Sequence, residues 1–197
     1  MPQAMDAAVK RTIDHLQTDA ATVAVENLTA DGGRIDFSVA VANLGGHKLP
    51  TAYPSRRAWL HVTVRDAAGR PVFESGALGA DGAIKGNDND EDGARFEPHH
   101  TTITRPEEVQ IYESVMAGAD GAPTTGLLTA VRFAKDNRIL PIGFNKQTAD
   151  KDVAVHGEAE GDADFIGGSD RVRYTVNTGS ATGPFTVTAE LWYQPVA

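Results

Sequence analysis

Cysteine is absent from this 197-residue sequence. The chain can therefore form no disulfide, no zinc–thiolate site and no cysteine nucleophile, and it cannot attach a c-type haem, which needs a C-x-x-C-H run. No apolar run approaches the length of a membrane span. Lys and Arg number 18 against 27 Asp and Glu, and the net charge of −9 disfavours a nucleic-acid partner, because phosphate binding needs clustered cations.

The remaining composition is that of a folded domain. Hydrophobic residues make up 41% of the sequence and charged residues 23%, and the length is sufficient to bury one large core. There are no sequence repeats and no alternation of strands with helices, so a parallel α/β fold is not expected. We expect residues 1–20 to form a helix and linker, and residues 21–197 to form the main domain.

Periodicity predicts the elements of this domain. Apolar residues recur at helical spacing over 4–18, which predicts a short amphipathic helix, and strict alternation begins at residue 21. Asp31-Gly32-Gly33 predicts a hairpin turn between the first two strands. The expected strands are 21–28, 34–42, 58–66, 71–74 (at an edge), 101–103, 108–115, 127–134, 171–176 and 184–193. Residues 127–134 also fit a helix, but their β-branched and aromatic content favours a strand.

Two segments lack this periodicity of apolar residues. Residues 76–100 and 149–164 are rich in Gly and Asp, and we expect them to be long loops, which in a compact domain are usually functional or mobile. Eight or nine strands at regular spacing, with turn signals between them, predict an all-β, immunoglobulin-like β-sandwich with long loops and a short N-terminal helix.

The loop before the third expected strand is the strongest candidate for a binding site. Glycines at 45–46 and prolines at 50 and 54 constrain the backbone around His47. Loops held by a rigid sheet commonly carry binding groups. Arg56 and Arg57 follow, and either could bind a carboxylate with two hydrogen bonds. The competing interpretation is that these arginines form salt bridges to the acidic loops.

A cation site is also suggested by composition. Asp88, Asp90 and Asp92 alternate with other polar residues in the run GNDNDEDG, and oxygen ligands of this kind suit calcium. The spacing of an EF-hand is not met, and a solvated acidic loop remains the other interpretation. His99 and His100 are further candidate metal ligands, because imidazole binds metals readily. Asp162, Asp164 and Asp170 could add carboxylates to the cation of the acidic loop or to another cation.

Signals for catalysis are weak. Ser55 lacks the glycines of a nucleophile elbow, and no short histidine spacing typical of a four-coordinate zinc or copper site is present. His61 is expected to be a surface or cross-strand residue. We therefore do not expect an enzyme.

Several runs together resemble the C-terminal β-sandwich region of periplasmic or extracellular multihaem c-type cytochromes. They are GHKLPTAYPSRRAWLHVTVRDAAGRPVFESG, NDND, EPHH, VQIYES, LLTAVRFAKDNRILPIGF, GGSD and LWYQP. In that family a similar Gly-His-x-x-Pro-Thr loop follows a haem-bearing part. The resemblance implies that the sandwich packs on haem domains, that His47 is an axial ligand to a haem c held by another segment or chain, and that a haem propionate pairs with Arg56 or Arg57.

Three functions are therefore compatible with the sequence. The first is a non-catalytic β-sandwich module whose partner is a multihaem cytochrome segment or subunit. The second is a stand-alone, calcium-stabilised binding module that recognises a protein or glycan through its long loops. The third is a metalloenzyme that uses the histidines with Asp or Glu.

Overall fold

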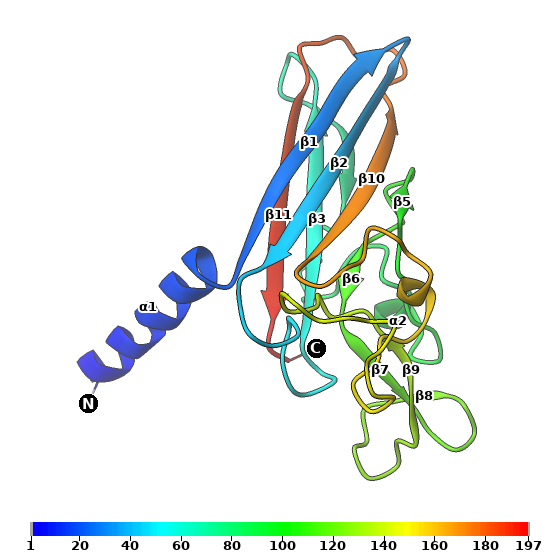
Figure 1. Cartoon of the computed structure of the whole chain (residues 1–197). Coiled ribbons are helices and arrows are strands. Elements are labelled where there is room, and N and C mark those ends of the chain that lie inside the picture. The colour runs from blue at the N-terminus through cyan, green and yellow to red at the C-terminus, as the bar shows by residue number, and fades with distance from the viewer. Residues whose placement is uncertain (1, 197) are drawn as a thin grey trace.

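The computed structural model describes residues 2–196 and confirms the predicted all-β sandwich (Figure 1). Its helices are α1 (Pro2–Thr18) and α2 (Asp88–Glu91), with a 3₁₀ turn, η1, at Glu158–Glu160. Its strands are β1 (Ala21–Asp31), β2 (Arg34–Asn43), β3 (Arg57–Arg65), β4 (Pro71–Ser75), β5 (Thr102–Ile103), β6 (Ile111–Tyr112), β7 (Ser114–Ala117), β8 (Pro123–Thr124), β9 (Arg132–Asp136), β10 (Ser169–Asn177) and β11 (Thr186–Gln194).

The first sheet has the strand order β1-β2-β10-β5, and its centre is the antiparallel pair β2 and β10. The alternation in β2 has the predicted effect: Ile35, Phe37, Val39 and Val41 are each at most 3% exposed. The hairpin from β1 to β2 turns through Gly32 and Gly33 at positive φ, as a two-residue turn of this kind requires.

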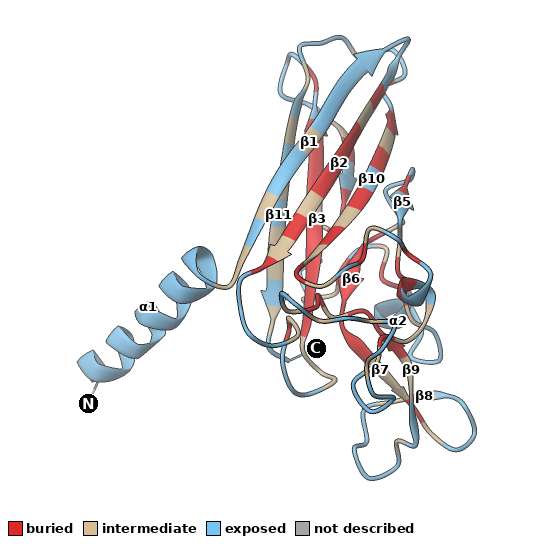
Figure 2. Ribbon diagram, viewed as in Figure 1, coloured by how far each residue is buried: buried red, intermediate tan, exposed pale blue. Residues whose placement is uncertain are grey.

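The second sheet has the order β11-β3-β4, with β6 pairing the start of β3, and β4 is an edge strand as predicted. Its inner face carries Leu60, Val62 and Val64, all fully buried against the first sheet. Within the first sheet the ring of Phe37 stacks on its cross-strand partner Tyr174, with centroids 5.0 Å apart. Figure 2 shows burial concentrated on β2, β3 and β10, whereas β1 is largely exposed.

The segment predicted as one loop over 76–100 is more structured than expected. It contains α2, and it lies over the outer face of β3, where a second small core forms. This core consists of Trp59, Ile84, Val109 and Ile111, with Trp192 packed against it edge-on to Trp59. The sequence did not predict this packing, because Ile84 is the one large apolar residue of the segment that is buried, and a single residue shows no periodicity.

The predicted strand over 127–134 was placed too early. Residues Leu127 to Thr129 form a turn, in which the Gly126 carbonyl accepts from the amides of Thr129 and Ala130, and β9 begins only at Arg132. The predicted strand over 108–115 is likewise divided into β6 and β7. The chain leaves the second sheet after Tyr112 and joins a separate three-stranded sheet, β8-β7-β9, at one end of the sandwich.

Helix α1 projects away from the sandwich next to β1 (Figure 1). Its predicted apolar stripe exists but is exposed: Met5, Val9 and Ile13 retain 67%, 56% and 47% of their accessible surface. Within residues 2–196, neither helix combines the length and apolar character that crossing a membrane requires.

Gly76 offers a test of the packing on β3. Its φ is +78°, and a Cβ there would overlap the Leu60 carbonyl oxygen, whereas Gly69, with φ +77°, has open space around it. We expect Gly76→Ala to lower the free energy of unfolding by at least about 3 kcal/mol and Gly69→Ala by about 1 kcal/mol, as measured by urea denaturation. Equal losses in the two variants would show that the close approach of Gly76 to β3 is not a constraint.

Candidate functional site

The loop that carries His47 is pinned at several points between β2 and β3. The side-chain amide of Asn43 donates to the carbonyls of His47 and Ile139, at 2.6 and 3.0 Å. Leu49 and Ile139 exchange two backbone hydrogen bonds, at 2.9 and 2.8 Å. Asn43 is only 1% exposed, so its side-chain amide has no access to water and depends on these two carbonyls for its hydrogen bonds. The loop is thus held against the segment that follows β9.

His47 is exposed at the surface of this pinned loop. Its ring takes part in no hydrogen bond or ion pair within residues 2–196. Beside it lies a hollow of about 510 Å³, which is lined by residues of the loop together with Arg138, Pro141, Phe144, Asp152 and Val153. The imidazole is therefore free to bind a group that approaches from outside.

A buried ion cluster holds Lys48, the residue after His47 in the same loop. The Asp136 carboxylate, 1% exposed as a side chain, accepts from the Lys48 ammonium at 2.7 Å and from two guanidinium nitrogens of Arg138 at 2.8 and 2.7 Å. Burial lowers the pKa of Lys48, and the charge of Asp136 opposes this shift. Two cations share one carboxylate, which leaves a net positive charge at this position.

The two arginines expected to bind a carboxylate lie apart from that cluster. Arg57 is 4% exposed, and its guanidinium donates to Asp90 at 2.7 Å and to Gln194 at 2.9 Å. The competing interpretation, a salt bridge to the acidic loop, therefore holds for Arg57. Arg56 donates to the Thr51 carbonyl at 3.2 Å and so closes its own loop.

The acidic run does not gather its oxygens around one point. Asp90 accepts from Arg57 and, at 2.7 Å, from the Ile84 amide, so it ties α2 to the second sheet. Asp88 and Asp92 face Arg95 at 3.4 and 3.7 Å. These contacts give the predicted calcium site no support, because Asp90 pairs with Arg57 while Asp88, Glu91 and Asp92 surround the guanidinium of Arg95.

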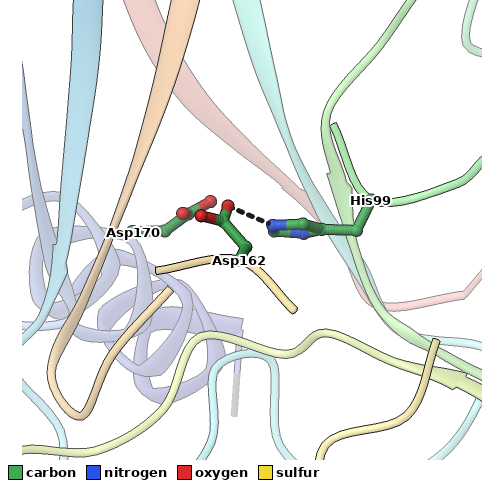
Figure 3. A group of neighbouring side chains, drawn as sticks. All are labelled: His99, Asp162 and Asp170. Carbon is green, nitrogen blue, oxygen red and sulfur yellow. Dashed lines mark hydrogen bonds and ion pairs between the residues drawn. The ribbon is translucent and has the colours of Figure 1, made fainter. Parts of the chain in front are cut away.

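Figure 3 shows three candidate residues, suggested separately by the sequence, that the fold brings together: His99, Asp162 and Asp170. One ligand atom from each lies within 4.8 Å of the others, a spacing that no other such group in residues 2–196 meets. His99 precedes β5, Asp162 follows η1 and Asp170 lies on β10. His100 points elsewhere, with its Nε2 atom 2.6 Å from Glu97.

Hydrogen bonds determine which nitrogen of His99 carries the proton. Its Nδ1 atom faces the side-chain amino groups of Gln110, at 2.8 Å, and Asn137, at 3.1 Å, so it can only accept. Both amides are held in this orientation by their oxygens, which accept from the backbone amides of His100 and Glu113.

The Nε2 atom of His99 therefore carries the proton and donates to Asp162 at 3.1 Å. A metal at Nε2 would move the proton to Nδ1, against two donors. The donor set fits a neutral, hydrogen-bonded histidine and does not fit a metal ion, despite the spacing.

The carboxyl group of Asp170 is the part of this cluster that is best placed to hold a proton. Burial raises its pKa to about 7, the nearby charge of Asp162 adds to the shift, and a 2.7 Å hydrogen bond from Tyr112 opposes it. The Tyr174 hydroxyl is buried and has no hydrogen-bond partner. Burial lowers the pKa of His99 to about 4, with Asp162 opposing.

Sequence reasoning missed the roles of Asp136 and Arg138. The available signal was three charged residues, Lys135, Asp136 and Arg138, directly before the apolar pair Ile139-Leu140. Lys135 is fully buried and donates to the Glu97 and Ile111 carbonyls and to Glu113. Charges that interrupt an apolar run in this way are either paired in the interior or functional.

The acidic run can be tested with two aspartates. Asp90→Ala removes one partner of the shielded Arg57 pair and is expected to lower the free energy of unfolding by about 3 kcal/mol. Asp92→Ala, at an exposed position, should change it by less than about 0.5 kcal/mol. Chemical denaturation with and without calcium measures both. A calcium-dependent rise in stability that Asp92→Ala abolishes would contradict this interpretation and restore the cation site.

The buried cluster predicts an unusual dependence of stability on pH. Between pH 4 and 6.5 the folded chain holds a proton on Asp170 and the unfolded chain holds one on His99, so the two contributions cancel. Asp170→Asn leaves His99, whose lowered pKa makes stability fall by about 3 kcal/mol as pH drops from 6.5 to 4. His99→Gln leaves Asp170, whose raised pKa makes stability fall by about 4 kcal/mol as pH rises from 4 to 7.

Urea denaturation at a series of pH values measures these opposite slopes. The wild-type chain serves as the control, with little slope from this pair. If both variants follow the wild-type curve, the assignment of the proton to Asp170 is wrong.

Comparison with known proteins adds one likeness of fold. No family model matches the sequence, and no curated protein matches it. The crystal structure of a penta-heme cytochrome c552 from Thermochromatium tepidum superposes with a TM-score of 0.53 at 17% sequence identity. The match covers 93% of this chain and 34% of that chain, so this chain spans about a third of the length of that cytochrome. At this identity the chain is similar in fold to part of a multihaem cytochrome.

Proposed function

We propose that this chain is a non-catalytic β-sandwich module of a multihaem c-type cytochrome, located in the periplasm or outside the cell. It packs on a haem-bearing segment or subunit, and His47 is the axial ligand to a haem c that this partner holds. The observation that carries the proposal is the position of His47: an exposed imidazole without internal partners, on a loop that the fold has pinned.

The likeness of fold supports the choice of partner. A module that spans 34% of a penta-haem cytochrome leaves most of that protein for segments of other kinds. This chain has no cysteine, so any c-type haem would be attached to a different part of the complex.

The geometry of the loop supports the axial role. Haem iron binds a neutral imidazole through one ring nitrogen. Asn43 and Leu49 already fix the conformation of the loop. Ligation of iron by His47 therefore costs little additional conformational entropy, which makes the free energy of binding more favourable. The hollow beside His47 is lined by apolar residues, by two cations, Lys48 and Arg138, and by one carboxylate, Asp152; the excess of cations suits a macrocycle with carboxylates.

The other two functions have less in their favour. The carboxylates of the acidic loop are engaged by Arg57 and Arg95, which leaves the calcium-stabilised module without a specific observation. A metalloenzyme would need a metal at the buried histidine, where the proton on Nε2 opposes one. We therefore assign no catalytic residue.

A haem peptide with one open axial position tests the proposal. N-acetylated microperoxidase-8, in its ferric form, should bind the chain and change from a high-spin to a low-spin Soret spectrum as the imidazole ligates the iron. We expect His47→Ala to abolish the change and His15→Ala, which removes an exposed histidine on α1, to leave it intact.

Two results would refute the axial role. One is a low-spin spectrum of the same amplitude in His47→Ala. The other is a loss in His15→Ala as large as that in His47→Ala, which would show that any exposed histidine serves equally.

A further inference from the structure

Arg138 lies at the junction of two hollows. One is the hollow beside His47, and the other, of about 270 Å³, adjoins it, because Ala52 and Arg138 line both. The second hollow is lined mainly by apolar side chains, among them Tyr53, Met116, Leu127 and Phe133. Arg138 is its one charged lining residue among the described part of the chain.

The apolar lining of this second hollow is accessible. Tyr53 and Leu127 retain 59% and 53% of their accessible surface. Leu127 belongs to the turn between β8 and β9, and Tyr53 to the His47 loop, so two segments distant in sequence form its two walls. An apolar group that entered would bury both side chains, which favours binding.

The ion cluster where the two hollows meet carries more positive than negative charge, although the Asp152 carboxylate also lines the hollow beside His47. Lys48 and Arg138 share the single carboxylate of Asp136, and their side chains are only 11% and 16% exposed. A surplus charge that is shielded from water is unfavourable unless an anion accompanies it. In a chain of net charge −9, this local positive position is an exception.

Arg138 also has donors to spare. A guanidinium carries five N–H donors, and Arg138 gives those on Nε and one terminal nitrogen to Asp136. Within residues 2–196 the other terminal nitrogen makes no hydrogen bond. Lys48 uses two of its three donors, on Asp136 and on the Ala154 carbonyl. Both cations can therefore donate to a further carboxylate without leaving Asp136.

We propose that Arg138 and Lys48, with the apolar walls formed by Tyr53, Leu127 and Phe133, bind a carboxylate that is carried on a large apolar group. The inference rests on the proposed function, under which this group is the haem at His47 and the carboxylate is a haem propionate. The propionate is thereby assigned to Arg138 and Lys48 rather than to Arg56 or Arg57. Arg56 donates to a carbonyl of its own loop, and Arg57 donates to Asp90 in a salt bridge.

A pair of porphyrins that differ only in charge tests this assignment. Ferric mesoporphyrin IX carries two ionised propionates, and in its dimethyl ester both are uncharged methyl esters. The wild-type chain should bind the acid about tenfold more tightly than the ester, as measured by quenching of tryptophan fluorescence at equal cosolvent concentration. Arg138→Gln should lose this preference by weakening the acid alone.

Two further variants separate charge from shape. Arg132→Gln removes an exposed cation of β9 outside the second hollow and should retain the preference of the wild-type chain. Leu127→Ser, at a half-exposed position, should weaken acid and ester by the same factor, because it removes apolar contact and no charge. Urea denaturation checks that each variant is folded.

The outcomes distinguish this inference from the proposed function. Equal affinity of the wild-type chain for acid and ester, or binding of neither, overturns the carboxylate site, and a His47-dependent low-spin spectrum with the haem peptide would then still support the axial role. A preference for the acid that Arg138→Gln abolishes supports the carboxylate site even if no His47-dependent spectrum is found, in which case the proposed function fails alone.

Discussion

The side-chain amide of Asn43 joins segments of the chain that are far apart in sequence. It donates to the carbonyls of His47 and Ile139 and accepts from the Gly45 amide, and its backbone amide donates to Gly168. The end of β2, the His47 loop, the segment after β9 and the turn before β10 are thereby fixed relative to each other. The polar groups that we assign to binding, His47, Lys48 and Arg138, lie on the His47 loop and on the segment after β9.

The ion cluster around Asp136 and the cluster around His99 both contain buried ionisable groups, and each compensates the cost of burying charge differently. Both place charged groups where water is excluded, which is unfavourable without compensation. At Asp136 the carboxylate forms ion pairs with Lys48 and Arg138, so the three groups together carry one net positive charge. At His99 burial favours the uncharged imidazole and a protonated Asp170, and the remaining charge of Asp162 accepts a hydrogen bond from His99. Only the first leaves cationic donors unused on side chains that line a hollow, so only the first is suited to an anionic ligand.

Much of the fold could be predicted from the sequence, because strands buried on one face keep a strict period of two. The run of Ile35, Phe37, Val39 and Val41 shows this directly. The prediction was wrong where burial does not follow a period. Leu127 and Leu128 look like the start of a strand but occupy an exposed turn, and Ile84 is fully buried within a segment predicted as a loop.

The site could be predicted in part. Glycine and proline around His47 indicated a constrained, exposed loop, and the structure places His47 there. The partners of the loop could not be found, since Asp136 and Arg138 lie about 90 residues further along the chain and local sequence carries no record of such contacts. Asp162 and Asp170 were among the candidates, but their meeting with His99 depends on three separate segments.

We propose that His47 binds haem iron, and nuclear magnetic resonance of the six histidines can observe that bond residue by residue. With histidine labelled by nitrogen-15, the ring signals of His47 should be the first to broaden and shift as a ferric haem peptide is added. Those of His99, which is enclosed in the core, should remain unchanged. The account is contradicted if the His47 signals stay in place while the haem peptide binds, or if those of another histidine move in their stead.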